Sequence, residues 1–205
     1  VVKGKAEPKA VVRFKRLLEA LRGLNPDQAS KLDGELAAVL IDWLDADQDL
    51  TFPGGAEDDT YMNRERPYRC ANAPMVSPSE LLLLKGVDVE VYALLQPHVA
   101  TLPKVTSLNV NTATTAVLMS LAKGVTDTDV ENLIADRPYE KVKDFEAHKA
   151  LAGRKLDKDI LGVESEHFLI VSQVQYGSLS QQRYSVLARD EKAEGRILQR
   201  AQGAD

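Results

Sequence analysis

Residues Asp42 to Asn72 read DWLDADQDLTFPGGAEDDTYMNRERPYRCAN and form the most acidic and least regular stretch of the chain. The first eighteen of them include no lysine or arginine and seven carboxylates: Asp42, Asp45, Asp47, Asp49, Glu57, Asp58 and Asp59. Carboxylates this close repel one another unless a cation or solvent screens them, and calcium takes six to eight oxygen ligands. The stretch therefore predicts either a calcium-bound loop or a solvated acidic surface.

The spacing of Asp45, Asp47 and Asp49 resembles the first half of an EF-hand loop, but the match ends there. An EF-hand needs glycine at its sixth position and glutamate at its twelfth, where this chain has Leu50 and Ala56. Any metal site in this stretch is therefore expected to be an irregular loop.

The whole chain has 205 residues, of which 44% are hydrophobic, enough for one or two globular domains. Its net charge of −5 argues against a general binder of nucleic acid or anionic membrane. Cys70 is the only cysteine, so no disulfide can form within these residues. Because the chain has no long apolar run and no signal peptide, we expect it to be soluble as given. Its first residue is not methionine, so we expect it to be a fragment of a longer protein.

Helical periodicity dominates the first part of the chain. Residues 11–24 have the spacing of an amphipathic helix. A second helix is expected from Pro26 to Leu44, and it would carry Asp42 and Asp45 on one face beside the acidic stretch.

The acidic stretch is expected to continue as a loop to about Pro78, because proline and glycine are frequent in it. A loop of this length is usually functional or disordered. Its large apolar side chains favour packing over disorder; they are Phe52, Tyr61, Tyr68 and Met75.

Two helical hairpins are expected next, at 77–98 and 109–137, and both turn at Lys-Gly-Val followed by a polar residue. Residues 139–159 are also expected to be helical. Near residue 164 the pattern changes to β-rich runs, which predict an antiparallel meander of two or three strands; the runs are 168–176, 183–188 and 196–199.

These elements predict an α+β fold, in which a large helical domain with two hairpin units is joined to a small antiparallel sheet. We expect three domains. Residues 8–106 form the first helical unit with the acidic loop, 107–165 the second helical unit, and 166–205 the strands.

The hairpins raise the possibility of nucleic-acid binding, because helix-hairpin-helix motifs hold phosphate at backbone amides of the turn. Such turns usually have a second glycine, whereas this chain has Asp88 and Thr126 there, and each hairpin region carries a net charge of −2. Nucleic-acid binding therefore remains only the alternative interpretation.

Catalysis has little support in the sequence. His98, His148 and His167 lie in separate predicted elements without metal-ligand spacing. No phosphate loop, dinucleotide fingerprint or nucleophile elbow occurs, and Cys70 has no partnered histidine. We do not expect an enzyme.

Several motifs in fixed order resemble the K-type minor pseudopilins of type II secretion, the GspK family. The matching segments are LIDWLDAD (40–47), PGGAED (53–58), PYRCANAP (67–74), SEL (79–81), KGV (85–87) and LNVNTA (108–113). The resemblance is strong from about residue 11 to residue 138.

This resemblance implies a pilin-like protein with a large helical domain, made of two SAM-like units, inserted into its β-sheet. Such proteins are bitopic inner-membrane proteins that cap the periplasmic pseudopilus tip with I-type and J-type minor pseudopilins. The membrane helix and the early strands would precede this chain. Contact with secreted substrate stays open, as does a third class, a calcium-dependent extracellular adhesion module.

The resemblance also implies bound calcium in the acidic loop region. From the acidic spacing within the matched motifs, we expect ligands from Asp45, Asp47, Glu57, Asp58 and Asn72. Asp42 and Asp49 are further candidates.

Overall fold

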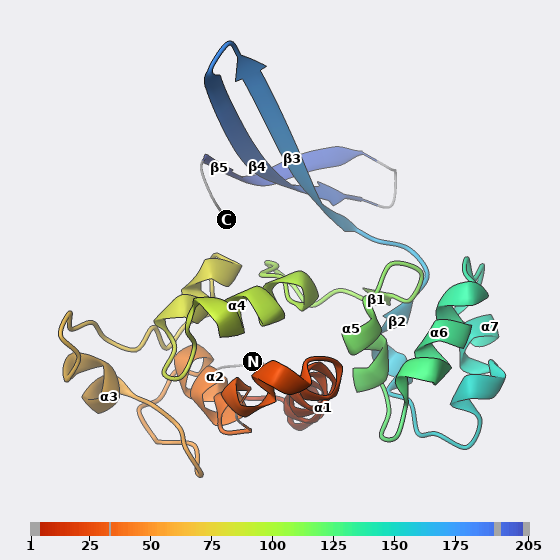
Figure 1. The fold of residues 1–205 in the computed structure, drawn as a ribbon, viewed down its shortest axis with the longest axis horizontal. Coiled ribbons are helices and arrows are strands. Elements are labelled where there is room, and N and C mark those ends of the chain that lie inside the picture. The colour runs from red at the N-terminus through yellow and green to blue at the C-terminus, as the bar shows by residue number, and fades with distance from the viewer. Residues whose placement is uncertain (1–4, 33, 191–193, 203–205) are drawn as a thin grey trace.

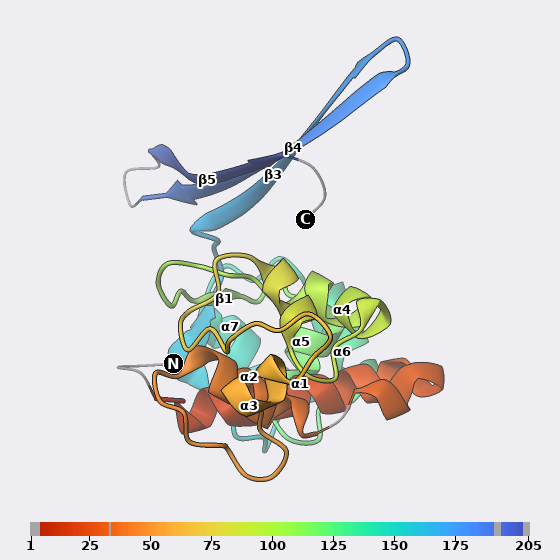
Figure 2. The ribbon, with the colours of Figure 1, turned by 90° about the vertical axis from the view of Figure 1, so that its left-hand side faces the viewer.

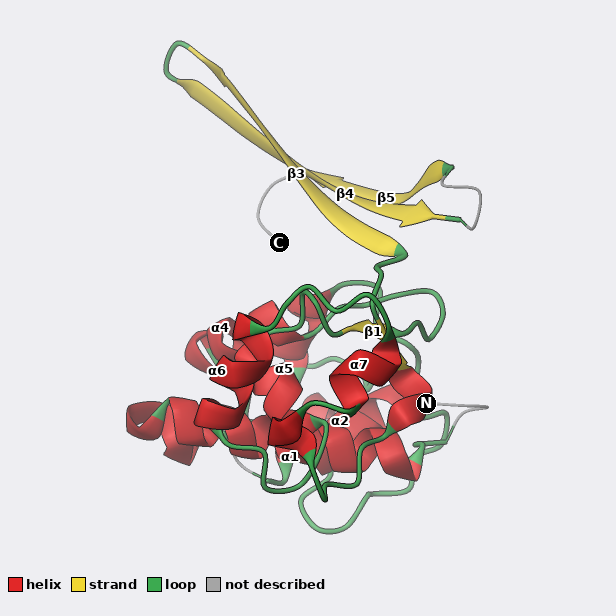
Figure 3. Ribbon diagram, turned by 90° about the vertical axis from the view of Figure 1, so that its right-hand side faces the viewer, coloured by secondary structure: helices red, strands yellow, loops and turns green. Residues whose placement is uncertain are grey.

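In the computed structural model, which describes residues 5–32, 34–190 and 194–202, a helical body carries a small β-sheet on one side (Figure 1). Colouring by secondary structure separates the two parts clearly, with helices in the body and the long strands outside it (Figure 3). The predicted α+β fold with an antiparallel sheet is thus confirmed.

The first helix, α1, spans Pro8–Leu24 and begins three residues before the predicted start. Proline is tolerated there because the first helical N–H groups have no intrahelical partner. The second predicted helix is wrong in its first half. Pro26–Lys31 form a 3₁₀ turn, η1, and helix α2 spans only Leu36–Leu44. Gly34, which lies between them, has low helix propensity.

The acidic loop contains a short helix that the sequence pattern did not predict, α3 at Asp58–Met62. The first hairpin lies where it was expected, but its first arm is the 3₁₀ segment η2 at Pro78–Leu83. Helix α4 at Val89–Leu95 and the 3₁₀ turn η3 at Gln96–His98 form its second arm.

The second hairpin is also confirmed, with α5 at Thr115–Ser120 and α6 at Asp127–Ala135. Residues 139–159, which were expected to be helical, are helical only in short pieces. They are α7 (Val142–Glu146), η4 (Lys149–Leu151) and η5 (Lys158–Ile160). His148 accepts a hydrogen bond from the N–H of Ala150 and so begins a new turn, and Gly153 has a positive φ of 74°.

Two short parallel strands close the second hairpin region. Strand β1 (Leu108–Asn109) pairs with β2 (Leu161–Gly162), and Asn111 donates hydrogen bonds to the carbonyl oxygens of Tyr139 and Val163. Strands of two residues carry no readable periodicity, so this pairing could not be predicted.

The helical body holds two clusters of buried side chains. One centres on Leu18, Trp43 and Tyr61, and the other on Leu118 and Phe145. The clusters touch, because α1 packs against α5 and both clusters include side chains of that helix. The proposed domain boundaries near 106 and 165 therefore stay a prediction.

The sheet has the order β3-β4-β5, with strands His167–Tyr176, Leu179–Arg189 and Gly195–Gln202. Both pairs are antiparallel, and β5 reaches only to the position opposite Arg183, so the outer part is a two-stranded hairpin. This hairpin projects away from the helical body (Figures 1 and 2). The predicted meander is confirmed.

Residues 163–166, the neck, connect the helical body to β3. Contacts on both sides hold the neck: among them, Asn109 donates to the Ser165 hydroxyl at 2.9 Å, Lys104 pairs with Glu166 at 3.0 Å, and Arg189 donates to the Ser165 carbonyl at 3.1 Å. The side chain of Arg189 also lies over the ring of Phe168. The neck is thus bonded to the body on one side and to the sheet on the other.

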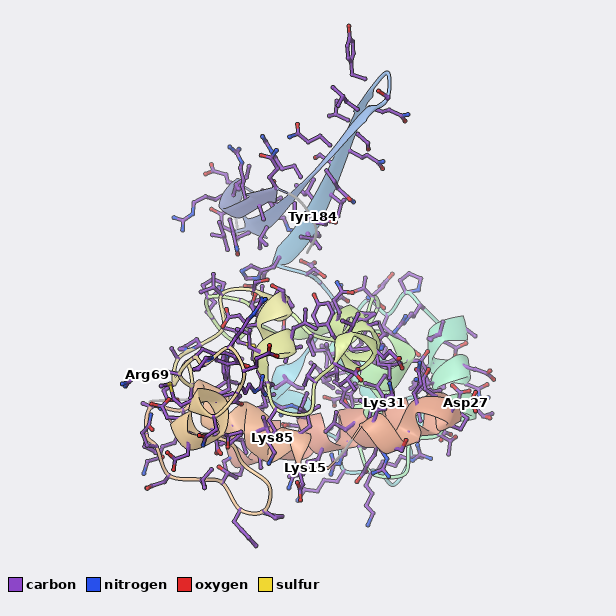
Figure 4. All side chains as sticks on the ribbon, turned by 60° about the vertical axis from the view of Figure 1, so that its left-hand side comes forward. Lys15, Asp27, Lys31, Arg69, Lys85 and Tyr184 are labelled. Atoms are coloured by element: carbon purple, nitrogen blue, oxygen red, sulfur yellow. The ribbon has the colours of Figure 1, made fainter. Side chains whose placement is uncertain are left out.

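The face of the sheet nearer the helical body borders an apolar pocket of about 220 Å³. Its lining combines Tyr92 and Val99 of the first hairpin region with Leu169 and Tyr184 of the sheet, and Tyr184 is labelled in Figure 4. Within the described part of the chain, no helix has the length and apolar composition to cross a bilayer.

Candidate metal centre

Aromatic side chains fix the acidic loop to the helical body. Trp43 of α2 meets Tyr61 of α3 edge-on at a ring distance of 5.3 Å, and Tyr61 stacks on Tyr68 at 5.4 Å. Arg64 lies over the rings of both tyrosines and hydrogen-bonds the Tyr68 hydroxyl. The predicted packing is confirmed for Tyr61, Tyr68 and Met75. The prediction is wrong for Phe52, which is 94% exposed.

Three of the five predicted ligands have buried oxygens without a hydrogen bond of normal geometry. These oxygens are Oδ1 of Asp45, both carboxylate oxygens of Glu57, and Oδ1 of Asn72. Asp45 is 7% exposed and Glu57 4%. A buried oxygen without a donor costs free energy, so these groups indicate a missing cationic or donor partner.

Burial and neighbouring charge both act on these carboxylates. The pKa of Glu57 is raised to about 7, chiefly by burial, with further contributions from the charges of Asp42, Asp45 and Asp58, while contact with the Cys70 thiol lowers it. The pKa of Asp45 is raised as well, first by burial and then by the nearby aspartates. The ionised forms of Asp45 and Glu57 are therefore destabilised unless a cation lies nearby.

The other two predicted ligands use an oxygen within the fold. Asp58 accepts the N–H of Cys70 at 2.8 Å and lies 3.7 Å from Arg69, whose side chain projects outward in Figure 4. Asp47 is exposed and accepts the N–H of Asp49, and its carbonyl oxygen accepts the side-chain amide of Asn72 at 2.6 Å. Asn72 has a positive φ of 44°, a conformation that asparagine tolerates better than most residues.

The two further candidates differ from each other. Asp49 is exposed on the loop. Asp42 is fully buried, and each of its oxygens accepts a backbone N–H, so neither is left unsatisfied as the oxygens of Glu57 are. Asp45 is the C-cap of α2, three residues after Asp42, and the charge of Asp42 contributes to the raised pKa of Asp45.

Among the described residues, no group of three or more His, Cys, Asp or Glu side chains is positioned to hold a metal. Calcium also takes amide and backbone carbonyl oxygens, which suits a loop containing Asn72 and two glycines. The three residues with unsatisfied oxygens fit a calcium site in the donor atoms they offer. The calcium site itself stays a prediction.

At both hairpin turns, side chains of this chain cap the N-terminus of the helix that follows. Asp88 accepts the N–H of Val91 at 2.8 Å and pairs with Lys31. Thr126 and Asp129 form a capping box at the start of α6, and Arg154 donates to Asp129 at 2.7 Å. Carboxylates thus occupy the positions where a phosphate would bind.

Comparison with known proteins identifies relatives along most of the chain. Family models described as type II secretion system protein K match residues 1–104 and 108–164. The type II secretion system protein K of Pseudomonas aeruginosa is 34% identical over 206 residues, covering 99% of this chain and 60% of the relative. That of Klebsiella pneumoniae is 34% identical, covering 93% and 59%.

A solved structure shares the fold. A chain in the crystal structure of the GspK-GspI-GspJ complex from enterotoxigenic Escherichia coli matches with a TM-score of 0.79 at 23% identity, covering all of this chain and 73% of that one. This chain spans about 60% of the length of the Pseudomonas and Klebsiella relatives. On these matches, the chain belongs to the type II secretion system protein K family.

Proposed function

We propose that this chain is the head of a minor pseudopilin that caps the tip of the type II secretion pseudopilus and so supports protein export across the outer membrane. The observation that carries the proposal is family membership, matched across both halves of the helical body. We assign it an assembly role and no enzymatic activity. Its place would be the periplasm, as part of a bacterial inner-membrane protein.

The proposed partners are the I-type and J-type minor pseudopilins, because the similar solved chain comes from a complex of GspK with GspI and GspJ. The sheet offers surface for such contacts, since apolar side chains on it are well exposed: Leu169 (53%), Val174 (63%) and Leu179 (72%). Exposed apolar surface of this kind usually becomes covered in an assembly. An N-terminal helix preceding these residues would supply further contacts.

The shape of the molecule suggests how capping would work. The helical body is much bulkier than the sheet and lies to one side of it (Figure 2). A subunit with such a head leaves no room for another subunit beyond it, so a filament could grow only from the opposite side. Capping would thus be steric and would need no chemical step.

Calcium would stabilise the head in this proposal. Asp45, Glu57 and Asn72 would contribute the oxygens that the fold leaves unsatisfied, and Asp47 and Asp58 would complete the set from the same loop. The ion would supply positive charge that offsets the repulsion among these carboxylates.

The test is light scattering after mixing this chain with soluble I-type and J-type minor pseudopilins. A defined one-to-one-to-one complex supports the proposal. Absence of a complex is followed by the same experiment with the soluble half of the preceding helix restored. If this longer protein also fails to form a complex, the tip role is wrong.

The alternative, a nucleic-acid-binding hairpin protein, is disfavoured by the carboxylates at both turns. It predicts salt-sensitive binding of labelled duplex DNA, measurable by fluorescence anisotropy. The adhesion-module alternative predicts calcium-dependent binding to cell surfaces without any pilin partner.

A further inference from the structure

The carboxylate of Asp42 lies at the centre of the acidic loop, although it is not among the residues with free oxygens. Its Oδ1 accepts the N–H of Thr51 at 3.0 Å, and its Oδ2 accepts the N–H of Ala56 at 2.7 Å. The side chain is fully buried, and within the described residues it forms no ion pair with a lysine or arginine. Two backbone amides therefore carry the stabilisation of this charge.

The backbone from residue 51 to residue 56 closes tightly around this carboxylate. The N–H of Gly55 donates to the carbonyl of Thr51 at 2.9 Å. A Cβ atom at Gly55 would lie 2.2 Å from Oδ2 of Asp42 and 2.6 Å from the carbonyl oxygen of Thr51. Only glycine fits there, so the loop and the carboxylate depend on each other's position.

A third segment is bonded to the same residue. The thiol of Cys70 donates to the carbonyl oxygen of Asp42 at 3.4 Å and lies 3.9 Å from that of Ala56. The N–H of Ala73 donates to the carbonyl of Trp43 at 3.4 Å, so the chain around residues 70–73 follows the end of α2.

These contacts place Asp42 next to the three loop segments whose carboxylate or amide oxygens are unsatisfied. Asp45 lies three residues further along at the end of α2, Glu57 directly follows Ala56, and Asn72 lies two residues after Cys70. A residue that fixes all three segments controls whether their oxygens can reach one ion.

We propose that Asp42 is a positioning residue for the cation site: it binds no ion itself and holds the segments of Asp45, Glu57 and Asn72 in register. This inference rests on the calcium site proposed above. It gives the loop's most buried carboxylate a different role from that of its neighbours. Residues that orient metal ligands typically change metal affinity by about 10–100-fold when they are replaced.

The test is calcium titration by isothermal calorimetry on the metal-free chain and three variants. Asp42→Asn keeps the shape of the side chain but replaces one acceptor oxygen by an NH₂ group. One of the two backbone N–H groups then loses its acceptor. Gly55→Ala displaces the loop from the carboxylate without changing charge. The control is Asp59→Asn, which removes one exposed negative charge from the same acidic stretch.

We expect calcium affinity to fall by about 10–100-fold in Asp42→Asn and in Gly55→Ala. In Asp59→Asn it should stay within about threefold, because an exposed charge is screened by solvent. A merely structural role would lower the unfolding temperature of the metal-free Asp42→Asn protein and leave calcium affinity unchanged. If a variant does not fold without calcium, the calcium concentration at the midpoint of refolding replaces the titration.

The inference is overturned if Asp42→Asn binds calcium within about threefold of the original chain, or if Asp59→Asn loses as much affinity. These outcomes leave the calcium site itself intact. If the unchanged chain gives no calcium binding, the proposed site fails and this inference fails with it.

Discussion

Arg13 of α1 forms a partly buried ion pair with Asp157, which lies 144 residues further along the chain. The pair connects the first helix of the body to the segment just before β2. Because the two side chains are only 20% and 13% exposed, solvent screens their attraction less than at an open surface. Together with the packing of α1 on α5, this contact joins the two halves of the helical body.

Replacing Asp157 by asparagine should lower the free energy of unfolding by about 1–2 kcal/mol, between the values for exposed and fully buried pairs. Urea denaturation measures it. Lys9 contacts the same carboxylate but is well exposed, so Lys9→Met is the control and should change stability little. Equal effects of the two substitutions would contradict this account.

Calcium should raise the melting temperature of the chain, because an ion that binds only the folded state stabilises it by mass action. At about one hundred times the dissociation constant the expected rise is about 5–10 °C. Differential scanning calorimetry with calcium, with magnesium and with a chelator tests it. A melting temperature that none of these changes would rule out the calcium site.

Glu57 should make the metal-free protein less stable as the pH rises. Its folded-state pKa of about 7 exceeds the ordinary value of 4.5, so between these values the folded state binds more protons than the unfolded state. Stability contributed by the neutral form is complete below pH 4.5 and is lost as the pH rises through 7.

The expected loss is on the order of 3 kcal/mol, because one pKa unit corresponds to about 1.4 kcal/mol. Unfolding in urea with chelator at several pH values measures it. Glu57→Gln should flatten this dependence and also abolish stabilisation by calcium. Asp59→Asn should keep the slope of the original chain; a steep slope in Glu57→Gln would show that another group is responsible.

Phe145 tests the second core cluster. Its side chain is fully buried and meets Tyr139 edge-on at 5.3 Å, so Phe145→Ala should cost about 3–5 kcal/mol through lost burial and a cavity. Val105 is 85% exposed, and Val105→Ala should change stability by less than about 0.5 kcal/mol. Thermal unfolding of both variants gives the comparison.

The elements predicted best are those with strong local patterns. The helix ending at Leu24 has apolar residues at helical spacing, the strands from His167 to Gln202 contain runs rich in β-branched and aromatic residues, and both occur as predicted. The region from 139 to 159 was misjudged, because an N-cap at His148 and a turn at Gly153 depend on local hydrogen bonds that periodicity does not report.

The acidic loop shows a different limit of sequence reasoning. The sequence names Asp45 as a ligand and Asp42 and Asp49 as further candidates, but their spacing does not tell their environments apart. Their environments differ: Asp42 is enclosed by backbone amides, Asp45 has a buried oxygen without a donor, and Asp49 faces solvent. Burial and backbone bonding, which depend on the tertiary fold, decide which of them can bind an ion. Phe52 was misplaced for the same reason.

The neck at residues 163–166 determines how the molecule responds to force. A push on the sheet reaches the helical body along this short covalent connection and through the side chains of Lys104, Asn109 and Arg189 that brace it. Together with the sheet side chains that face Tyr92 and Val99 across the apolar pocket, these contacts set how far sheet and head can twist against each other under load.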